Sequence, residues 1–410
     1  MKIFSNKNKI ISALLAIFMI KSINLYAAEA GGYFKNFSYM IYPQKDFSGF
    51  PDRPLGSVKN RMRINFLHAT NIVDFSLQAD LYSLIQDEFL YENTATITDT
   101  DIFEYRISDP DKRLYPGDKD DLRSFALYYN LDRLNISFDA GFSDIILGRQ
   151  AIAWGAARVV NPTDLFAPYT FSDIDTEDRA GVDALRIRIP TGLFSEIDCG
   201  YVCGKGCLFE DSAVYLRSRL YYKNTDITPL AVAFRENLLL GLNMAGAIGR
   251  AGVWMETGYV LSDVFKDTDS SSDYFRMTVG GDYNISSGLY GFIEYHYSGP
   301  GENDPEDYIK NVSNTSFQQG GVYLMAKHYL IPGINYQLAP LVTLTAQAMI
   351  NLSDISLFIT PSVEYNIAPN VYLSGGFFRG IGESPGNRGK MNSEFGSYPQ
   401  IYYLSTGIYF

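Results

Sequence analysis

Apolar and polar side chains alternate strictly along many short segments of this 410-residue chain. Residues 73–83 read VDFSLQADLYS, with apolar residues mostly at odd positions and polar residues at even ones. The same period recurs in 134–140, 182–189, 214–222, 253–261 and 289–298. A period of two is typical of β-strands that have one apolar and one polar face. Abundant Tyr (31), Phe (27) and Gly (35) also favour strands and turns, so we predict an all-β fold.

Two all-β architectures produce this pattern: a soluble sandwich or barrel with apolar faces inward, and a membrane barrel with its apolar face toward lipid. The C-terminal residues IYYLSTGIYF help to choose, because Tyr402, Leu404, Ile408 and Phe410 share one face. This ending resembles the C-terminal recognition signal of bacterial outer-membrane barrels. The resemblance implies insertion among outer-membrane lipids by the barrel-assembly machinery, which would recognise Phe410. The alternative is an ordinary last strand of a soluble β-domain.

The N-terminal residues have the layout of a signal peptide. Lys2, Lys7 and Lys9 precede the apolar run IISALLAIFMI, and small residues follow in LYAAEA. The apolar run is shorter than the roughly 20 residues of a spanning helix, so we expect export and not anchoring. We therefore predict a signal peptide at 1–28 and a single outer-membrane barrel domain at 29–410.

The balance of charge excludes some partners. The formal net charge is −12, and loss of the lysines at the N-terminus would make the chain more acidic. So acidic a chain is a poor candidate for binding nucleic acid or anionic lipid. Beyond the signal there is no run of about 18 apolar residues, so we expect no spanning helix. The sequence indicates no cofactor.

Connection lengths test the membrane barrel, because such barrels have short periplasmic turns and long extracellular loops. Counted back from Phe410, short links recur at 366–370, 338–341, 284–288, 249–252, 223–226, 190–195, 140–142 and 69–71. The alternate connections include the long ones, at 43–58, 86–121, 151–181, 204–210, 263–272, 299–322 and 380–396. This predicts a single transmembrane antiparallel barrel of about 18 strands, or 16 if the hairpin 227–249 is misassigned.

The polar parity of each strand then faces the interior. Because a ring of 18 strands is too wide for side chains to fill, we expect an aqueous channel in a Gram-negative outer membrane. The predicted pore-lining residues are Arg61, Arg63, Asp74, Asp80, Asp139, Arg186, Arg188, Glu196, Asp198, Arg217, Arg219, Glu256, Glu294 and His296.

Four of these arginines allow two interpretations. Arg186 and Arg188 lie on the strand beside Glu196 and Asp198, and Arg217 and Arg219 lie one strand further on. Cross-strand ion pairs that brace the wall are one interpretation. A track of arginines that orients an anionic solute is the other.

The segment 151–181 is the most distinctive passage in the chain. Its motif residues, with those just before it, are Gly148, Arg149, Gln150, Trp154, Gly155, Asn161, Pro162, Thr163, Asp164, Arg179 and Gly181. This GRQ/WG/NPxD pattern resembles the signature of a porin-like family of outer-membrane barrels, with a looser similarity to alginate-export barrels. A loop of about 30 residues that is too apolar for disorder is usually functional. We expect it to fold inward as a constriction, with a lid on the outer rim as the alternative.

The sequence contains three further groups of reactive or charged side chains. Cys199, Cys203 and Cys207 are expected to form one disulfide and leave one thiol, and the sequence does not decide which two are paired.

The many carboxylates of 86–121 are expected to belong to a solvated loop, with binding of divalent cations as the alternative. Glu294, His296 and Ser298 stand in a row on one strand, which would suit a hydrolase acting on esters or lipids. Because the row falls on the interior parity, we expect no enzyme.

The sequence as a whole predicts a porin-like channel for passive diffusion of small hydrophilic or anionic solutes, and the barrel could form a homotrimer. The alternatives are an outer-membrane hydrolase that uses His296 and Ser298, and a closed barrel that displays its loops for adhesion. The acidic composition predicts a mild preference for cations, whereas the arginine track predicts the opposite.

Overall fold

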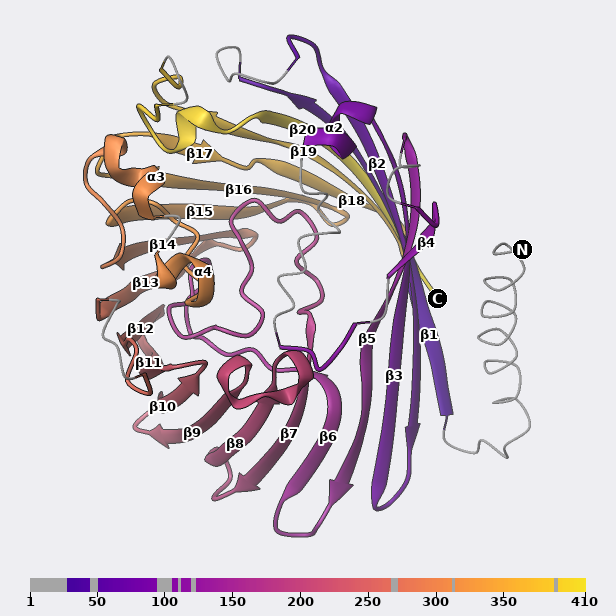
Figure 1. The fold of residues 1–410 in the computed structure, drawn as a ribbon, viewed down its shortest axis with the longest axis vertical. Helices are drawn as coiled ribbons and strands as arrows, with labels where there is room; N and C mark the ends of the chain where they lie inside the picture. Colours follow the sequence, from indigo (N-terminus) through magenta and orange to yellow (C-terminus); the bar gives the residue numbers. More distant parts are fainter. Residues whose placement is uncertain are drawn as a thin grey trace.

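The computed structural model is a closed antiparallel β-barrel (Figure 1). It describes residues 28–44, 51–93, 105–109, 112–118, 123–266, 272–311, 314–386 and 390–410. The predicted signal peptide therefore lies almost wholly outside the described residues. Every wall strand pairs antiparallel with its neighbours in the sequence, and β1 pairs with β20 to close the ring.

The wall contains 18 strands, because β4 is a short strand beside β5 and because β17 and β18 are two parts of one strand. The strands of the first half are β1 (Ala28–Tyr42), β2 (Leu55–Ala69), β3 (Val73–Gln86), β4 (Arg113–Tyr115), β5 (Phe125–Asp139), β6 (Asp144–Ala151), β7 (Gly181–Pro190), β8 (Glu196–Cys203), β9 (Ala213–Tyr222) and β10 (Thr225–Phe234). Those of the second half are β11 (Asn237–Ile248), β12 (Ala251–Leu261), β13 (Tyr274–Ser286), β14 (Leu289–Ser298), β15 (His328–Ala339), β16 (Val342–Asn351), β17 (Leu357–Ile359), β18 (Ser362–Ala368), β19 (Val371–Ile381) and β20 (Gln400–Tyr409).

Helices are short and occur in the connections. The α-helices of the described residues are α2 (Glu88–Asn93), α3 (Tyr308–Asn311) and α4 (Thr315–Gln319). The 3-10 helices are η3 (Lys205–Cys207), η4 (Phe209–Asp211), η5 (Pro305–Asp307) and η7 (Phe395–Ser397). In the part of the chain that the structure describes, no helix has the length and apolar character needed to span a membrane.

The predicted strand number and connections are confirmed. The hairpin in question, β10 to β11, is formed with Arg235 and Glu236 as its turn, so the 16-strand alternative is wrong. The short links predicted from the sequence all join strands at one end of the barrel, which we call the short-turn end. The other end, the long-loop end, carries the connections between β1 and β2, β3 and β5, β14 and β15, and β19 and β20.

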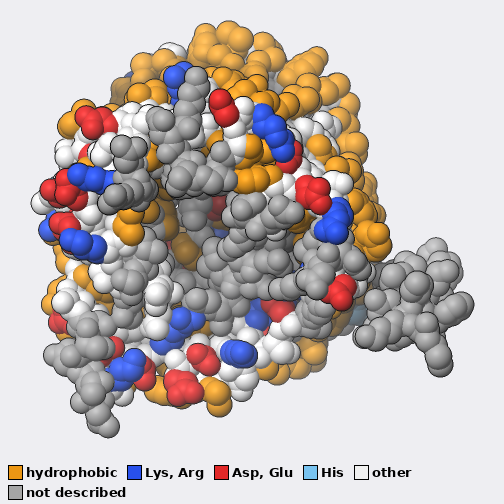
Figure 2. Space-filling view, turned by 45° about the horizontal axis from the view of Figure 1, so that its top comes forward, with side chains coloured by type: hydrophobic (Ala, Val, Ile, Leu, Met, Phe, Trp, Pro, Cys, Tyr) orange, Lys and Arg blue, Asp and Glu red, His pale blue; other side chains and the backbone are white. Residues whose placement is uncertain are grey.

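Hydrophobic side chains cover the outside of the wall (Figure 2). The exposed ones follow the predicted parity, and include Met62, Ile64, Leu81, Leu147, Leu216, Ile293, Val363, Tyr402, Leu404 and Ile408. The buried clusters lie on the inside instead, where the connection between β6 and β7 packs against the wall. A barrel of this width therefore fills part of its interior with its own loop.

Candidate functional site

Residues 152–180, which we call the inner loop, cross the interior of the barrel (Figure 1). The loop leaves β6 at Ala151 and returns to β7 at Gly181. Its first half bonds to β11–β14, and its second half bonds to β1, β2 and β20. These two groups of strands lie on opposite sides of the ring, so the inner loop bridges the lumen.

Glu256 on β12 anchors the first half of the inner loop. Its carboxylate accepts hydrogen bonds from the backbone N–H groups of Ala156 (2.7 Å), Ala157 (3.1 Å) and Thr163 (2.9 Å), and from the Thr163 hydroxyl (2.7 Å). The side chain is fully buried, with 0 % exposure. One carboxylate thus satisfies three backbone N–H groups of the loop and the Thr163 hydroxyl, which also bonds to Asn243 (3.2 Å).

Neighbouring strands add to this anchorage. Glu294 on β14 accepts bonds from the backbone N–H groups of Arg158 and Val159, the latter at 3.0 Å. On β13, Arg276 donates to the Pro162 carbonyl (2.7 Å) and Thr278 to the Val160 carbonyl (2.8 Å). The first half of the inner loop is therefore held by hydrogen bonds to its backbone, independently of most of its side chains.

The motif residues before and at the start of the inner loop set its path. Gly148 (φ 114°) and Gly155 (φ 143°) adopt backbone angles that side chains disfavour, and a Cβ on Gly155 would lie 2.1 Å from Asn161 Oδ1. Arg149 pairs with Asp183 (2.7 Å) and Asp109 (2.9 Å), which ties the base of the loop to β7 and to residues 105–109. Gln150 donates to the Ala184 carbonyl at 3.2 Å.

The later motif residues close the loop on itself. Trp154 Nε1 donates to the Thr163 carbonyl (2.8 Å), and its ring packs on Phe166 and Tyr215. Arg179 pairs with Asp164 at 3.2 Å and donates to the Ala167 carbonyl at 2.6 Å. The residues that the sequence pattern singled out thus lie together along one folded loop.

Asp164 gives a pH-dependent prediction. Burial raises its pKa to about 7, against the opposing effect of the Arg179 guanidinium, and the side chain is 2 % exposed. Because the pKa is raised in the folded state, protonation of Asp164 stabilises the fold. This stabilisation is complete below about pH 3.8 and is lost as the pH rises through 7. Asp164→Asn cannot ionise, so its stability relative to wild type should rise by roughly 2 to 3 kcal/mol between pH 5 and pH 8.

Thermal unfolding of the two proteins in detergent at both pH values measures this difference. Asp173→Asn, on the exposed part of the same loop, is the matched control. A difference between Asp164→Asn and wild type that is the same at both pH values would contradict the prediction.

An acidic segment, residues 173–178, holds the second half of the inner loop to β1 and β2. Lys35 pairs with Asp175 (2.7 Å) and Glu177 (2.6 Å), and Arg61 pairs with Asp175 (2.8 Å). Burial alone would raise the pKa of Asp175, but Arg61 and Lys35 together hold it below its usual value. Asp178 is bound by Arg63 at 2.5 Å. This half of the loop is attached mainly through its charged side chains, with one bond to its backbone, from Arg133 to the Arg179 carbonyl (2.5 Å).

A β-bulge behind this segment concentrates further charge. The register between β3 and β5 shifts at Ala79, so the consecutive residues Asp132 and Arg133 are both buried. Arg63 (1 % exposed) pairs with both Asp80 and Asp132. Arg61 and Arg63, predicted to line the pore, are therefore neutralised by carboxylates and covered by the inner loop.

Three of the four arginines of β7 and β9 form cross-strand ion pairs. Arg186 binds Asp198 with two bonds (3.0 and 2.7 Å), Arg188 binds Glu196 (2.6 Å), and Arg217 lies 3.4 Å from Asp198. Arg219 is exposed and, among the described residues, has no ion pair. The two carboxylates offset two of the four positive charges that an anion track would use.

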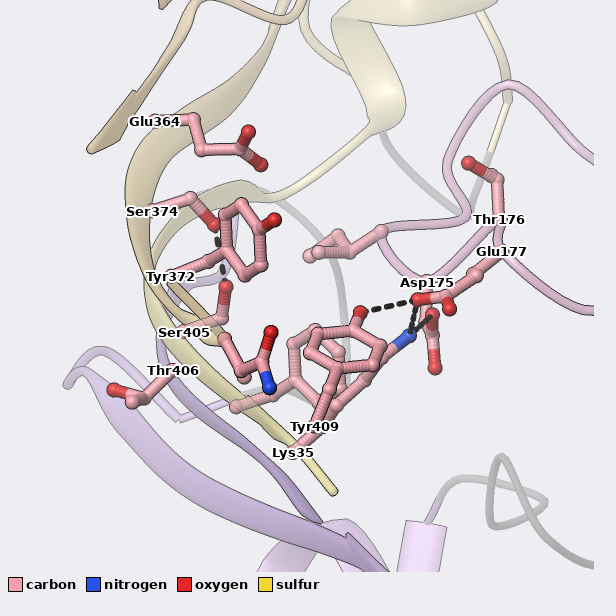
Figure 3. A pocket seen from close by; sticks show the side chains of 14 residues that line it. Lys35, Asp175, Thr176, Glu177, Glu364, Tyr372, Ser374, Ser405, Thr406 and Tyr409 are labelled. Atoms are coloured by element: carbon pink, nitrogen blue, oxygen red, sulfur yellow. Dashed lines mark hydrogen bonds and ion pairs between the residues drawn. The ribbon is translucent and has the colours of Figure 1, made fainter. Parts of the chain in front are cut away.

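A pocket, which we call the passage, lies between the acidic segment and the wall formed by β18–β20 and β1 (Figure 3). It has a volume of about 480 Å³ and is lined from the inner loop by Ile174, Asp175, Thr176 and Glu177. The wall side of the passage consists of Lys35, Phe37, Glu364, Asn370, Tyr372, Ser374, Ser405, Thr406, Gly407 and Tyr409. The lining contains three carboxylates against one ammonium group.

The remaining predicted residues are placed as follows. Asp74 and Asp139 are exposed on the interior parity near the short-turn end. His296 is 2 % exposed, and its Nδ1 bonds to the Thr278 hydroxyl at 2.9 Å. Glu294 bonds to the inner loop, and the Ser298 hydroxyl is buried without a hydrogen-bond partner. The row Glu294, His296 and Ser298 therefore contains no bond of a catalytic triad.

The other two features that the sequence raised are partly visible. Cys203 and Cys207 form a disulfide, and Cys199 is free. Much of the segment 86–121 lies outside the described residues, but Tyr105 packs on Phe166 of the inner loop and Arg106 donates to the Gly181 carbonyl (2.8 Å). Within the described ranges, no group of acidic, His or Cys side chains is placed to hold a metal ion.

Several residues of the passage were not singled out from the sequence. Lys35, Glu364, Tyr372 and Ser374 lie on segments whose alternation is weaker or whose interior parity is aromatic, so a search for alternating polar residues missed them. The acidic run at 173–178 could have been found as a charge cluster inside the predicted constriction loop.

No protein-family profile matches the sequence, and no curated protein matches it. Solved structures do match the fold. The OccK5 (OpdH) structure from Pseudomonas aeruginosa has a TM-score of 0.57 with 9 % identity, over 94 % of this chain and 98 % of that one. A BenF-like porin from Pseudomonas fluorescens Pf-5 has 0.56 with 11 % identity, over 94 % and 99 %.

OccAB3 from Acinetobacter baumannii also has a TM-score of 0.56, with 10 % identity over 93 % of this chain and 99 % of that chain. At such low identities these likenesses concern the fold alone. They agree with the predicted porin-like barrel architecture. The likeness of the GRQ/WG/NPxD pattern to a family signature, and that to alginate-export barrels, stay predictions.

Proposed function

We propose that this protein is a channel of the Gram-negative outer membrane through which small hydrophilic solutes diffuse passively. The observation that carries the proposal is the pocket of about 480 Å³ between the acidic segment and the wall of β18–β20 and β1, which we interpret as part of an open path through the barrel. An 18-strand wall that is apolar outside and polar inside suits a membrane-spanning channel. The porin named among the structural matches supports the same conclusion by fold.

The inner loop sets the width of this channel. It is attached on both sides of the lumen and leaves the passage along one part of the wall. The predicted pore-lining carboxylates Glu256 and Glu294 act in this proposal as anchors of the loop. Arg186, Arg188 and Arg217, paired with carboxylates, brace the wall instead of guiding anions.

The passage favours cations weakly. Asp175, Glu177 and Glu364 outnumber Lys35 in its lining, although Lys35 bonds to two of these carboxylates. A narrow aqueous passage with an excess of one charge selects for the opposite charge. This preference for cations is the one predicted from the acidic composition. The arginine track predicted a preference for anions.

The proposed partners follow from the surface. Outer-membrane lipids would contact the exposed apolar side chains of the wall. Phe410, at the end of the closing strand β20, would be the signal for the barrel-assembly machinery. A homotrimer is compatible with the barrel, and no nucleic acid is proposed as a partner.

Swelling of liposomes that contain the refolded protein tests the proposal. Small neutral solutes should enter, and entry should fall steeply as solute size approaches the width of the passage. The potential at zero current in a salt gradient should have the sign of a weak cation preference. Liposomes that admit no solute would contradict the proposed function.

A further inference from the structure

The wall of the passage contains a recess that is defined by the strand register. Paired residues form three rows across β18, β19, β20 and β1. The middle row is Glu364, Ser374, Ser405 and Phe37; the row toward the short-turn end is Asn366, Tyr372, Gly407 and Lys35; the row toward the long-loop end is Ser362, Gly376, Tyr403 and Tyr39.

The floor of the recess is made of small residues. The hydroxyls of Ser374 and Ser405 bond to each other at 2.6 Å. Gly376 has no room for a side chain, since a Cβ would lie 2.4 Å from the Pro361 carbonyl oxygen and 3.0 Å from the Tyr403 ring. Gly407 continues the small floor on β20. The inner surface of the wall therefore has a depression where these small residues lie.

Aromatic rings surround this floor. Tyr372 and Phe37 line the passage directly, and Tyr39 and Tyr403 occupy the next row. Tyr409 packs edge-on against Tyr372, with ring centres 5.7 Å apart. These rings all lie on the interior parity, opposite to the lipid-facing Tyr402.

Polar groups stand at the ends of the recess and across the passage from it (Figure 3). Glu364 lies at one end of the middle row and Lys35 near the other. Asp175 and Glu177 of the inner loop face the wall from the opposite side, and Tyr409 donates to Glu177 at 2.6 Å. A solute in the passage would meet rings, hydroxyls and carboxylates together.

We propose that this recess binds a neutral, ring-shaped polyol of the pyranose class as it passes through the channel. The flat apolar face of such a ring packs on aromatic side chains, while its hydroxyls donate to carboxylates and exchange bonds with serines. A solute with a carboxylate is disfavoured by the three acidic side chains. The volume of the passage lies within the range of about 300 to 1,000 Å³ that holds small ligands. This inference rests on the proposed function.

Single-channel recording with maltose as the probe tests the inference. Maltose should reduce the current in a saturable way, whereas sorbitol, a polyol without a ring, should have only the effect of viscosity. Tyr372→Ala should weaken the apparent affinity for maltose by about threefold to tenfold, because stacking on one ring is lost. Tyr402→Ala, which removes a lipid-facing ring from β20, is the matched control and should leave the affinity unchanged.

The outcomes separate the two proposals. Current steps without saturable block by maltose, or equal losses in the two tyrosine variants, would overturn the pyranose site and leave the channel intact. The absence of any current steps would overturn the channel itself. If Tyr372→Ala does not fold, Ser405→Leu fills the floor of the recess and should abolish the block; a block that persists in Ser405→Leu would overturn the site.

Discussion

Glu256→Ala is expected to increase the single-channel conductance and its noise. The substitution removes the acceptor for four donors of the inner loop, three of them backbone N–H groups. Each buried donor left without a partner costs about 1 to 3 kcal/mol, so this half of the loop should detach for part of the time. The thermal stability of the barrel should fall as well.

Recordings from single channels in planar bilayers measure this effect. Met255→Ala is the matched control, because Met255 is the neighbouring residue on the other face of β12. Glu256→Gln is a second variant that keeps the shape of the side chain, but its amide group places donors against donors. A folded Glu256→Ala channel with the conductance and noise of wild type would show that the inner loop does not limit the current.

Glu364→Lys is expected to reverse the ion preference from cations to anions. A unit charge about 4 Å from a passing ion contributes about 1 kcal/mol in water. Replacing a negative with a positive charge therefore raises the energy of a passing cation by about 2 kcal/mol and lowers that of a passing anion by about 2 kcal/mol. Each change is roughly thirtyfold in permeability before screening by salt, and the permeability ratio changes by the product of the two factors. Glu364 is exposed in the passage, and no ion pair of the described residues involves it.

The zero-current potential in a salt gradient gives the permeability ratio directly. Glu364→Gln should give an intermediate value. Glu383→Lys adds the same charge on the connection between β19 and β20, outside the passage, and should leave the ratio near that of wild type. A ratio that responds equally to Glu364→Lys and Glu383→Lys would contradict the assignment of the passage.

The barrel could be predicted because its signals are local. Alternation places Leu404 and Ile408 outside the wall, and the lengths of the connections divide the chain into 18 strands. A strand can be identified from its own alternation and from the turn at each of its ends. The hairpin of β10 and β11 could therefore be predicted despite its weak pattern. The ion pairs of Arg186 with Asp198 and of Arg188 with Glu196 could also be anticipated from neighbouring strands.

The candidate site could be predicted only in part, because contacts across the lumen leave no period in the sequence. Nothing near Glu256 indicates that it binds Thr163, which is 93 residues away. The bulge that buries both Asp132 and Arg133 breaks the parity from which interior residues were assigned. Tyr372 and Phe37 were not predicted to line the pore because only polar residues were used to identify interior positions.

Single-channel recording of the refolded wild-type protein in a planar bilayer tests the central claim most directly. An open passage beside an anchored inner loop predicts discrete and uniform current steps with a weak preference for cations. A correctly folded barrel that inserts into the bilayer and produces no current steps would contradict the account.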